Sequence, residues 1–194
     1  FNDSLKLQKI SAETWAKHEE SNYKNILEPI SNRQINKKIK IGYYSADLHN
    51  HAIGQLMVNL FELHDKSKFE IVGFYFGPES KHEMYTRISN AFDQFINVKF
   101  KTDKEIAQLS RELNIDIAID LMGFVKNNRF KIFIDRCAPI QVNYLGYPGT
   151  LGTNCFEYII ADKTLIPKES QEYYSEKIVY LPNSYQPNDS KKKI

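Results

Sequence analysis

The chain has 194 residues, 42% of them hydrophobic and 26% charged, which suits one soluble globular domain with a real core. Its formal net charge of +2 is too small for the basic surface that nucleic-acid binding needs. No apolar run approaches the roughly 20 residues of a membrane span, and the first residues contain neither an initiator Met nor a signal peptide. We therefore expect a piece of a longer cytoplasmic protein.

The first expected element is a helix within residues 5–27. Ser11, followed closely by Glu13 and Trp15, has the pattern of a helix start, and Pro29 is a natural stop. The polar and basic residues 31–38 are expected to be a linker. This pattern divides the chain into an N-terminal helical segment with its linker, residues 1–37, and a main domain, residues 38–194.

The main domain alternates expected strands with expected helices. Strands are expected at residues 39–44, 69–76, 95–98, 115–123, 139–145, 158–162 and 177–181, and helices at 52–64, 82–92, 103–114 and 128–136, with Asp103 as the cap of the third. Such an alternation predicts a parallel sheet with helices on both faces, and so a Rossmann-like α/β domain. The Gly-rich dinucleotide fingerprint, the Walker A sequence and the nucleophile-elbow motif are all absent.

Three loops that follow expected strands should meet at one edge of the sheet, where open α/β domains bind ligands. Their polar or glycine residues are Asp47, His49, Asn50 and His51 in the first loop, Gly123, Lys126, Asn127, Asn128 and Arg129 in the second, and residues 146–150 in the third. His51 suits general-base chemistry near neutral pH, and Lys126 and Arg129 suit an anionic ligand. Gly146 has no Cβ, so its backbone could approach a ligand closely.

Each loop also has a plain structural interpretation. His51 could be a solvated or helix-capping residue, Lys126 and Arg129 a charged helix start, and residues 146–149 a tight turn with Gly146 at a positive φ angle. The two cysteines, Cys137 and Cys155, are too far apart for a metal or redox motif, and we expect free thiols in a reducing compartment. From the residues alone, the chain is a ligand-binding α/β domain.

Several of these segments carry a family resemblance. Residues 41–47, 50–51 and 56–57 resemble the start of the catalytic region of the O-linked N-acetylglucosamine transferases, and residues 138–150 resemble a signature of the same family. Residues 185–189 are similar to the form found in its bacterial branch, which is linked to tetratricopeptide repeats. The resemblance extends from about Trp15 to the end of the chain.

The resemblance implies the N-terminal lobe of a two-lobed GT-B glycosyltransferase, without its C-terminal lobe and its preceding repeats. The implied reaction is the inverting transfer of N-acetylglucosamine from UDP-GlcNAc to a Ser or Thr hydroxyl of an acceptor protein, with no metal or other cofactor. His51 is the implied catalytic residue, as base or as organiser of the substrates. The implied substrate-binding residues are Asn50, Lys126, Arg129, Leu145, Gly146, Pro148, Gly149 and Thr150.

The sequence departs from the family pattern at one wall of the expected cleft. Phe124 and Val125 stand where relatives often have polar side chains, which leaves the sugar and acceptor preference open. Two other classes of function also remain: a module that binds protein or sugar without turnover, and a flavodoxin-like regulator. The regulator would need an acidic cluster after the first strand, and Asp47 alone does not supply one.

Overall fold

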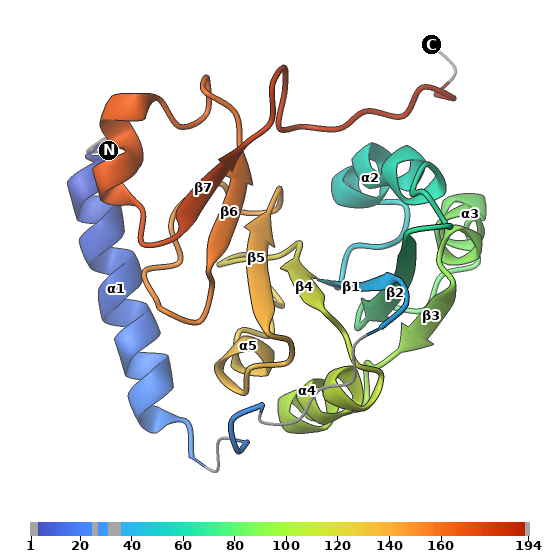
Figure 1. Cartoon of the computed structure of the whole chain (residues 1–194), viewed down its shortest axis with the longest axis horizontal. Helices are drawn as coiled ribbons and strands as arrows, with labels where there is room; N and C mark the ends of the chain where they lie inside the picture. The colour runs from blue at the N-terminus through green and yellow to red at the C-terminus, as the bar shows by residue number, and fades with distance from the viewer. Residues whose placement is uncertain (1–3, 25–26, 31–35, 193–194) are drawn as a thin grey trace.

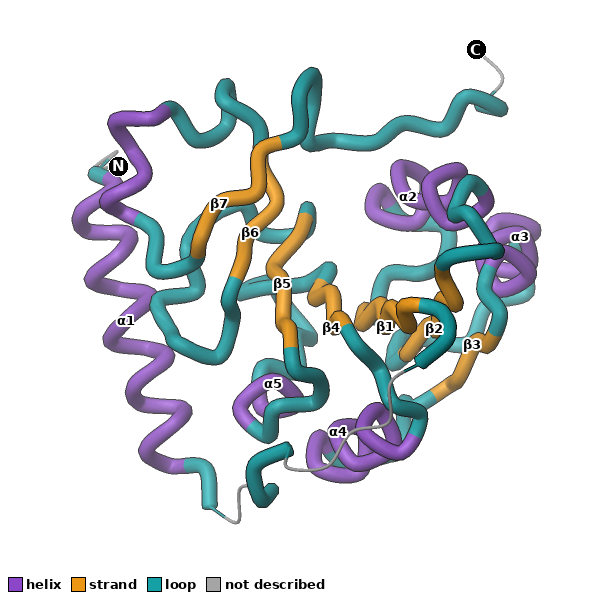
Figure 2. Tube along the Cα trace, viewed as in Figure 1, coloured by secondary structure: helices purple, strands orange, loops and turns teal. Residues whose placement is uncertain are grey.

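The computed structural model describes residues 4–24, 27–30 and 36–192. Its helices are α1 (Leu5–Asn22), α2 (Ala52–Glu62), α3 (Glu83–Ala91), α4 (Asp103–Glu112), α5 (Lys131–Ile134) and the 3-10 helix η1 (Lys168–Tyr173). Its strands are β1 (Ile39–Ser45), β2 (Phe69–Tyr75), β3 (Gln94–Asn97), β4 (Ile117–Asp120), β5 (Ile140–Tyr144), β6 (Tyr158–Ala161) and β7 (Lys177–Tyr180). Figures 1 and 2 show these elements along the chain. Most of the linker expected at residues 31–38 lies outside the described residues.

All seven strands form one parallel sheet in the order β3-β2-β1-β4-β5-β6-β7. From β1 the chain builds outward through β2 to β3, and β4 then pairs with the other side of β1. The order therefore reverses between β1 and β4, and ligands of such sheets bind at this reversal. The predicted Rossmann-like parallel sheet is confirmed.

Helices cover both faces of the sheet, as predicted (Figure 1). Tyr43 and Tyr44 show how β1 feeds both layers, because successive side chains of a strand point to opposite faces. Tyr43 packs edge-on against Phe61 in the layer of α2 and α3. Tyr44 stacks on Phe74 in the layer of α1, α4 and α5, with ring centroids 4.4 Å apart. A strand buried on both faces explains the nearly continuous apolar sequence of β1.

The N-terminal helix differs from its predicted bounds. It begins at Leu5 with Ser4 as the N-cap, which agrees with the expected segment 5–27, but Ser11 lies inside the helix, so the start signal at Ser11 is wrong. The helix ends at Asn22, before the predicted stop at Pro29, because Tyr23 turns extended and its hydroxyl donates a hydrogen bond to Asp135. The local Ser4 cap sets the N-terminal end, whereas the C-terminal end is set by a tertiary contact that a local pattern does not show.

Two further helix predictions need correction. Thr102, rather than Asp103, caps α4, and it forms a capping box with Glu105. The helix predicted at residues 128–136 is reduced to the four residues of α5, and the positive φ angle of Arg136 marks its C-terminal end. The remaining strands and helices agree with their predictions to within a few residues.

Helix α1 packs directly on the main domain. Ala16 is fully buried in the core, and the Trp15 ring lies edge-on to Phe124 and Phe130 at 4.4 and 5.2 Å. Near its C-terminal end, Glu20 accepts a hydrogen bond from Thr153. Among the described residues, no helix combines the length and apolar character needed to cross a membrane.

Candidate functional site

The three loops singled out in the sequence meet at the carboxyl edge of the sheet. They follow β1, β4 and β5, which are adjacent and parallel, so their ends lie side by side. Two of them flank the reversal of strand order between β1 and β4. The fold therefore brings the expected histidine, basic and glycine-containing loops to one place.

His51 is the N-cap of α2 as well as the candidate catalytic residue. Its Nδ1 accepts a hydrogen bond from the backbone N–H of Ile53 at 3.3 Å. Because Nδ1 is the acceptor, the neutral ring carries its proton on Nε2. The His51 side chain is 46% exposed, so Nε2 is open to a ligand.

Asp47 is the charged group closest to His51. Its Oδ2 lies 3.7 Å from Nδ1, too far for a hydrogen bond. His49 lies on the same loop, with its ring 5.9 Å from that of His51. Desolvation lowers the pKa of His49, which favours its neutral form. The exposed Asn50 accepts a hydrogen bond from Gln55 through its side chain.

The two basic residues of the second loop have different surroundings. Lys126 is exposed at the tip of the loop. Arg129 is mostly buried and forms an ion pair with Asp103 at 2.5 Å, and it donates to the backbone oxygen of Lys101 at 2.7 Å. Its guanidinium also lies over the Phe76 ring. Substrate binding by Arg129 stays a prediction, and the contacts establish that it joins the loop to the start of α4.

Asp120 holds the first turn of the second loop, a role that the sequence reading did not assign. The carboxylate is buried and accepts hydrogen bonds from the backbone N–H groups of Met122 and Gly123 at 2.9 and 3.0 Å. Burial raises its pKa to about 6, and the two backbone donors only partly oppose that. An Asp at the end of a buried strand, three residues before a Gly, was the available signal.

The backbone of the third loop is strained and closely packed. Leu145 is buried with φ at +69°, a conformation that non-glycine residues rarely adopt and that clusters at functional sites. Gly146 does not have a positive φ angle, so the interpretation that the glycine is needed only for such an angle is wrong. A Cβ at Gly146 would lie 2.0 Å from the carbonyl oxygen of Leu121. The glycine therefore lets two loops of this domain touch, and a larger side chain here would disturb the fold.

Hydrogen bonds to Glu176 and Asn143 hold the third loop in place. Thr150 is buried, and its hydroxyl donates to Glu176 at 2.8 Å, while the next residue, Leu151, donates its backbone N–H to the same carboxylate at 2.7 Å. Asn143 donates to the backbone oxygens of Tyr147 and Gly149. Pro148 is exposed at the tip and Gly149 is half-buried, so these two positions face outward. Direct substrate contacts by all of them stay predictions.

A pocket of about 530 Å³ opens between α1 and the second and third loops. It is lined by Leu7, Gln8, Ser11, Ala12, Trp15, Phe124, Asn128 and Tyr147. Phe124, where the sequence departs from the family pattern, forms its aromatic wall together with Trp15. Within the described ranges, no cluster of His, Cys, Asp or Glu side chains has the arrangement of a metal site.

The fold defines a Rossmann-like α/β domain whose candidate ligand site lies beyond the ends of its central strands. The profile of glycosyl transferase family 41 matches residues 3–194, and the chain belongs to this family. The resemblance to O-linked N-acetylglucosamine transferases is thereby confirmed.

Named relatives agree with this assignment. The chain is 35% identical over 157 residues to the probable UDP-N-acetylglucosamine–peptide N-acetylglucosaminyltransferase SEC of Arabidopsis thaliana, which covers 81% of the chain and 16% of that protein. It is 30% identical to the UDP-N-acetylglucosamine–peptide N-acetylglucosaminyltransferase of Caenorhabditis elegans, over 78% of the chain and 13% of the relative. A mutant O-GlcNAc transferase from Thermobaculum terrenum has the same fold, with a TM-score of 0.85 and 29% identity over 95% of this chain and 35% of that one. The chain thus spans less than a fifth of the length of the Arabidopsis and Caenorhabditis relatives.

Proposed function

We propose that this chain is the N-terminal lobe of a two-lobed GT-B glycosyltransferase that moves N-acetylglucosamine from UDP-GlcNAc to Ser or Thr residues of acceptor proteins. The observation that carries the proposal is that His51, Lys126 and the 145–150 loop follow three adjacent parallel strands and so lie at one edge of the sheet, beside the reversal of strand order. Family membership and the activities in the relatives' names support the same donor and acceptor class.

In the proposed reaction, the acceptor hydroxyl attacks the anomeric carbon from the side opposite the leaving pyrophosphate, so the configuration inverts. Positioning and charge stabilisation account for most of the rate in such a transfer, and no metal or other cofactor is needed. The exposed Lys126 would attract the negatively charged pyrophosphate of the donor, and Pro148 and Gly149 would lie next to the sugar.

His51 would act as a hydrogen-bond donor through Nε2–H in the geometry observed. To serve as a base through Nε2, the ring would have to give up the Ile53 hydrogen bond and donate its Nδ1 proton to Asp47 instead. That change needs a shift of about an ångström, from the present 3.7 Å to hydrogen-bond distance. The resting structure therefore favours a role in organising the substrates.

The second lobe would hold most of the uridine diphosphate, and repeats ahead of the chain would present the acceptor protein in the cytoplasm. The small share of the relatives that this chain spans is consistent with such neighbours. Because the leaving group would be bound mainly by the other lobe, the isolated lobe should not catalyse transfer.

The test is transfer of radiolabelled N-acetylglucosamine from UDP-GlcNAc to acceptor proteins by the full-length protein and by residues 1–194. We expect transfer only by the full-length protein, with a β-linked product by NMR. Steady transfer by residues 1–194 would contradict the division of labour between lobes. Binding of UDP-GlcNAc by the full-length protein without transfer would favour the alternative, a binding module.

A further inference from the structure

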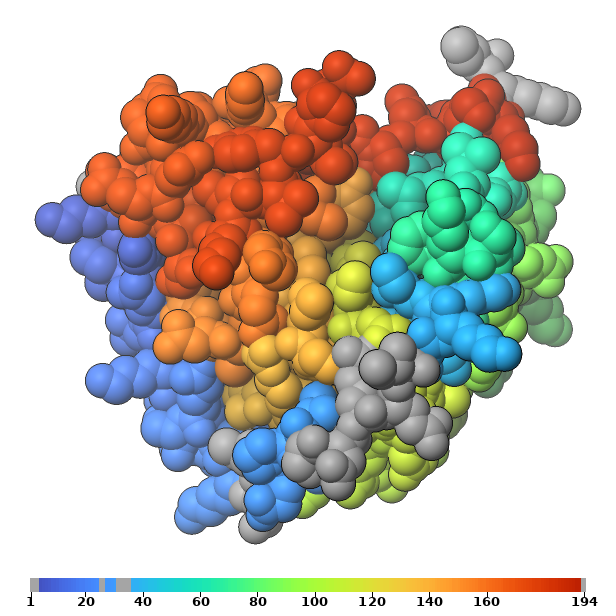
Figure 3. Space-filling view, viewed as in Figure 1, coloured from blue at the N-terminus to red at the C-terminus, as the bar shows by residue number. Residues whose placement is uncertain are grey.

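The last described residues, 185–192, form an extended segment that we call the C-terminal strap. After β7 the chain runs along the carboxyl edge of the sheet and reaches α2 and α3 on the other side of the molecule (Figure 1). In the space-filling view the strap lies directly on α2 (Figure 3). It includes residues 185–189, one of the sequence motifs that the proposed catalytic site does not use.

The first anchor of the strap is at β5 and β6. Tyr144 donates its hydroxyl hydrogen to the backbone oxygen of Tyr185 at 2.6 Å, and Tyr185 donates its N–H to Asp162 at 2.8 Å. Tyr144 is the last residue of β5, and the 145–150 loop follows it directly. This end of the strap therefore holds the strand from which the glycine-containing loop begins.

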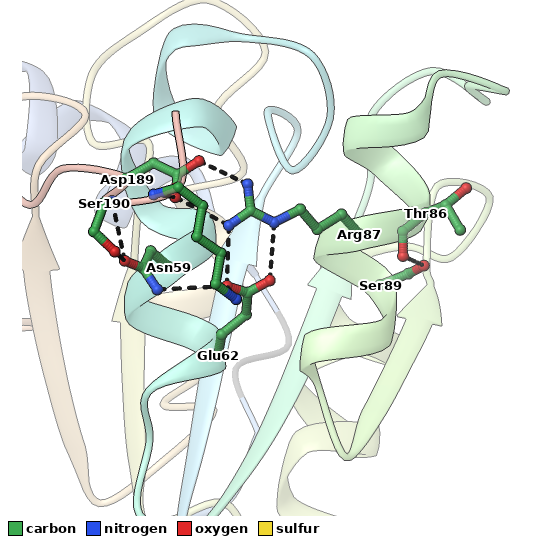
Figure 4. Close-up of polar contacts among 8 residues, drawn as sticks. Asn59, Glu62, Thr86, Arg87, Ser89, Asp189 and Ser190 are labelled. Carbon is green, nitrogen blue, oxygen red and sulfur yellow. Dashed lines mark hydrogen bonds and ion pairs between the residues drawn. The ribbon is translucent and has the colours of Figure 1, made fainter. Parts of the chain in front are cut away.

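The second anchor is centred on Arg87 of α3 (Figure 4). The guanidinium donates to both carboxylate oxygens of Asp189 in the strap, at 2.6 and 3.0 Å. It also donates to both carboxylate oxygens of Glu62 in α2, at 2.8 and 3.0 Å. One side chain thus joins two helices and the strap through paired hydrogen bonds, the strongest geometry for an Arg–carboxylate contact.

Neighbouring contacts reinforce this anchor on α2. Ser190 donates its hydroxyl and its N–H to the side-chain oxygen of the buried Asn59, and Lys191 donates to Glu62 at 2.7 Å. The Asp189 side chain is only 4% exposed and that of Arg87 is 27% exposed. Partial burial makes these ion pairs matter more than ordinary surface pairs.

Helix α2 connects this anchor to the candidate site. His51 caps its N-terminus, and Asn59 and Glu62 lie toward its other end, about 12 and 16 Å away along the 11-residue helix. The C-terminal end of the strap is therefore bonded to α2, which His51 caps, and its N-terminal end is bonded to β5, which leads into the 145–150 loop.

We propose that the C-terminal strap is a brace that fixes His51 relative to the 145–150 loop, with Arg87 as its positioning residue. This inference rests on the proposed function where it concerns transfer. Arg87 would touch neither substrate and would act through α2. Small errors in the spacing of groups around reacting atoms cost large factors in rate.

The test compares Arg87→Gln and Asp189→Asn with wild type in the full-length protein. Asp189→Asn weakens the strap but leaves the contact between Arg87 and Glu62. The matched control is Arg136→Gln, which also breaks a partly exposed Arg–Glu pair, with Glu157, but next to the amino ends of β5 and β6. The readouts are hydrogen exchange of residues 185–192, of the amides of Ile53 and Gly146, and the kinetics of transfer.

We expect both strap variants to speed exchange in the strap and at the two site amides. We also expect kcat to fall at least about tenfold, with a smaller change in KM for UDP-GlcNAc. The Arg136→Gln control should lower the melting temperature without these effects. The proposal is overturned if Asp189→Asn leaves kcat and the Ile53 and Gly146 amides unchanged. If the wild type transfers no sugar, the proposed function fails, and the exchange rates at the two site amides still decide whether the brace exists.

Discussion

The His51 side chain accepts a hydrogen bond from the backbone N–H of Ile53, so it both caps α2 and lies at the carboxyl edge of the sheet, where the candidate site is. Loss of His51 can therefore act in two ways, through the missing imidazole or through a frayed helix. The two are separable, because Asn is an excellent N-cap residue and has no ring.

In the full-length protein, we predict that His51→Ala and His51→Asn both lower transfer by at least about 100-fold, the scale for loss of one positioned hydrogen-bond donor or acid–base group. The alanine variant should also lose about 1 kcal/mol of stability with the cap, whereas the asparagine variant keeps it. Turnover numbers and melting temperatures of the pair measure this. Normal turnover by His51→Asn would make His51 only a capping residue.

Alanine substitutions at the two glycines of the third loop should change the free energy of unfolding by very different amounts. Gly146→Ala places a Cβ 2.0 Å from the Leu121 carbonyl oxygen, a backbone group that cannot move aside cheaply, so we expect a loss of more than about 2 kcal/mol in the free energy of unfolding. Gly149→Ala meets only atoms of the Tyr147 ring, which can turn away, so it should change stability by less than about 1 kcal/mol. Urea unfolding of both variants checks this. Equal stabilities would contradict the close approach of the two loops.

The sequence suggested the same role for Lys126 and Arg129, but substitutions at the two positions should have different effects on stability and on donor binding. Arg129→Gln loses the Asp103 ion pair and should lower the melting temperature with little effect on KM for UDP-GlcNAc. Lys126→Gln removes an exposed charge and should raise that KM severalfold without changing the melting temperature. Donor-dependent kinetics and thermal unfolding of each variant provide the comparison. A large KM effect of Arg129→Gln in a fully stable protein would restore its predicted substrate contact.

The strap's anchor should weaken in acid. Hydrogen bonds from Arg87 hold the pKa of Glu62 down at about 2, below its ordinary value near 4.5. A depressed carboxylate pKa stabilises the fold above pH 4.5, and that stability is lost as the pH falls toward 2. We therefore predict that wild type melts well above Glu62→Gln at pH 6 and that the difference shrinks between pH 4.5 and 2.

A second carboxyl group with a shifted pKa, that of Asp120, also makes stability depend on pH, but it does not affect the comparison between wild type and Glu62→Gln. The buried Asp120 has a raised pKa of about 6, so its contribution has the opposite sign, declining as the pH rises from about 4 to 6. It is present in both proteins and cancels in the difference between them. A difference in melting temperature that stays constant from pH 6 to pH 2 would contradict the role given to Glu62.

The sequence by itself determined the α/β class, the alternation of strands and helices, and the sheet edge at which the candidate site residues lie. These follow from local signals: apolar periodicity along each element, and polar or glycine residues directly after buried strands. The same local signals could not place the C-terminal end of α1 or reduce the predicted helix at 128–136 to α5. Those bounds depend on contacts such as that of Tyr23 with Asp135.

Only the tertiary structure decided what each candidate residue touches. It paired Arg129 with Asp103, Thr150 with Glu176, and Arg87 with both Glu62 and Asp189, residues up to 102 positions apart in the chain. A charged or polar side chain has the same sequence signature whether it faces a ligand or a distant part of its own chain. The difference is settled by packing, which brings the partner within hydrogen-bond distance and excludes water from the pair.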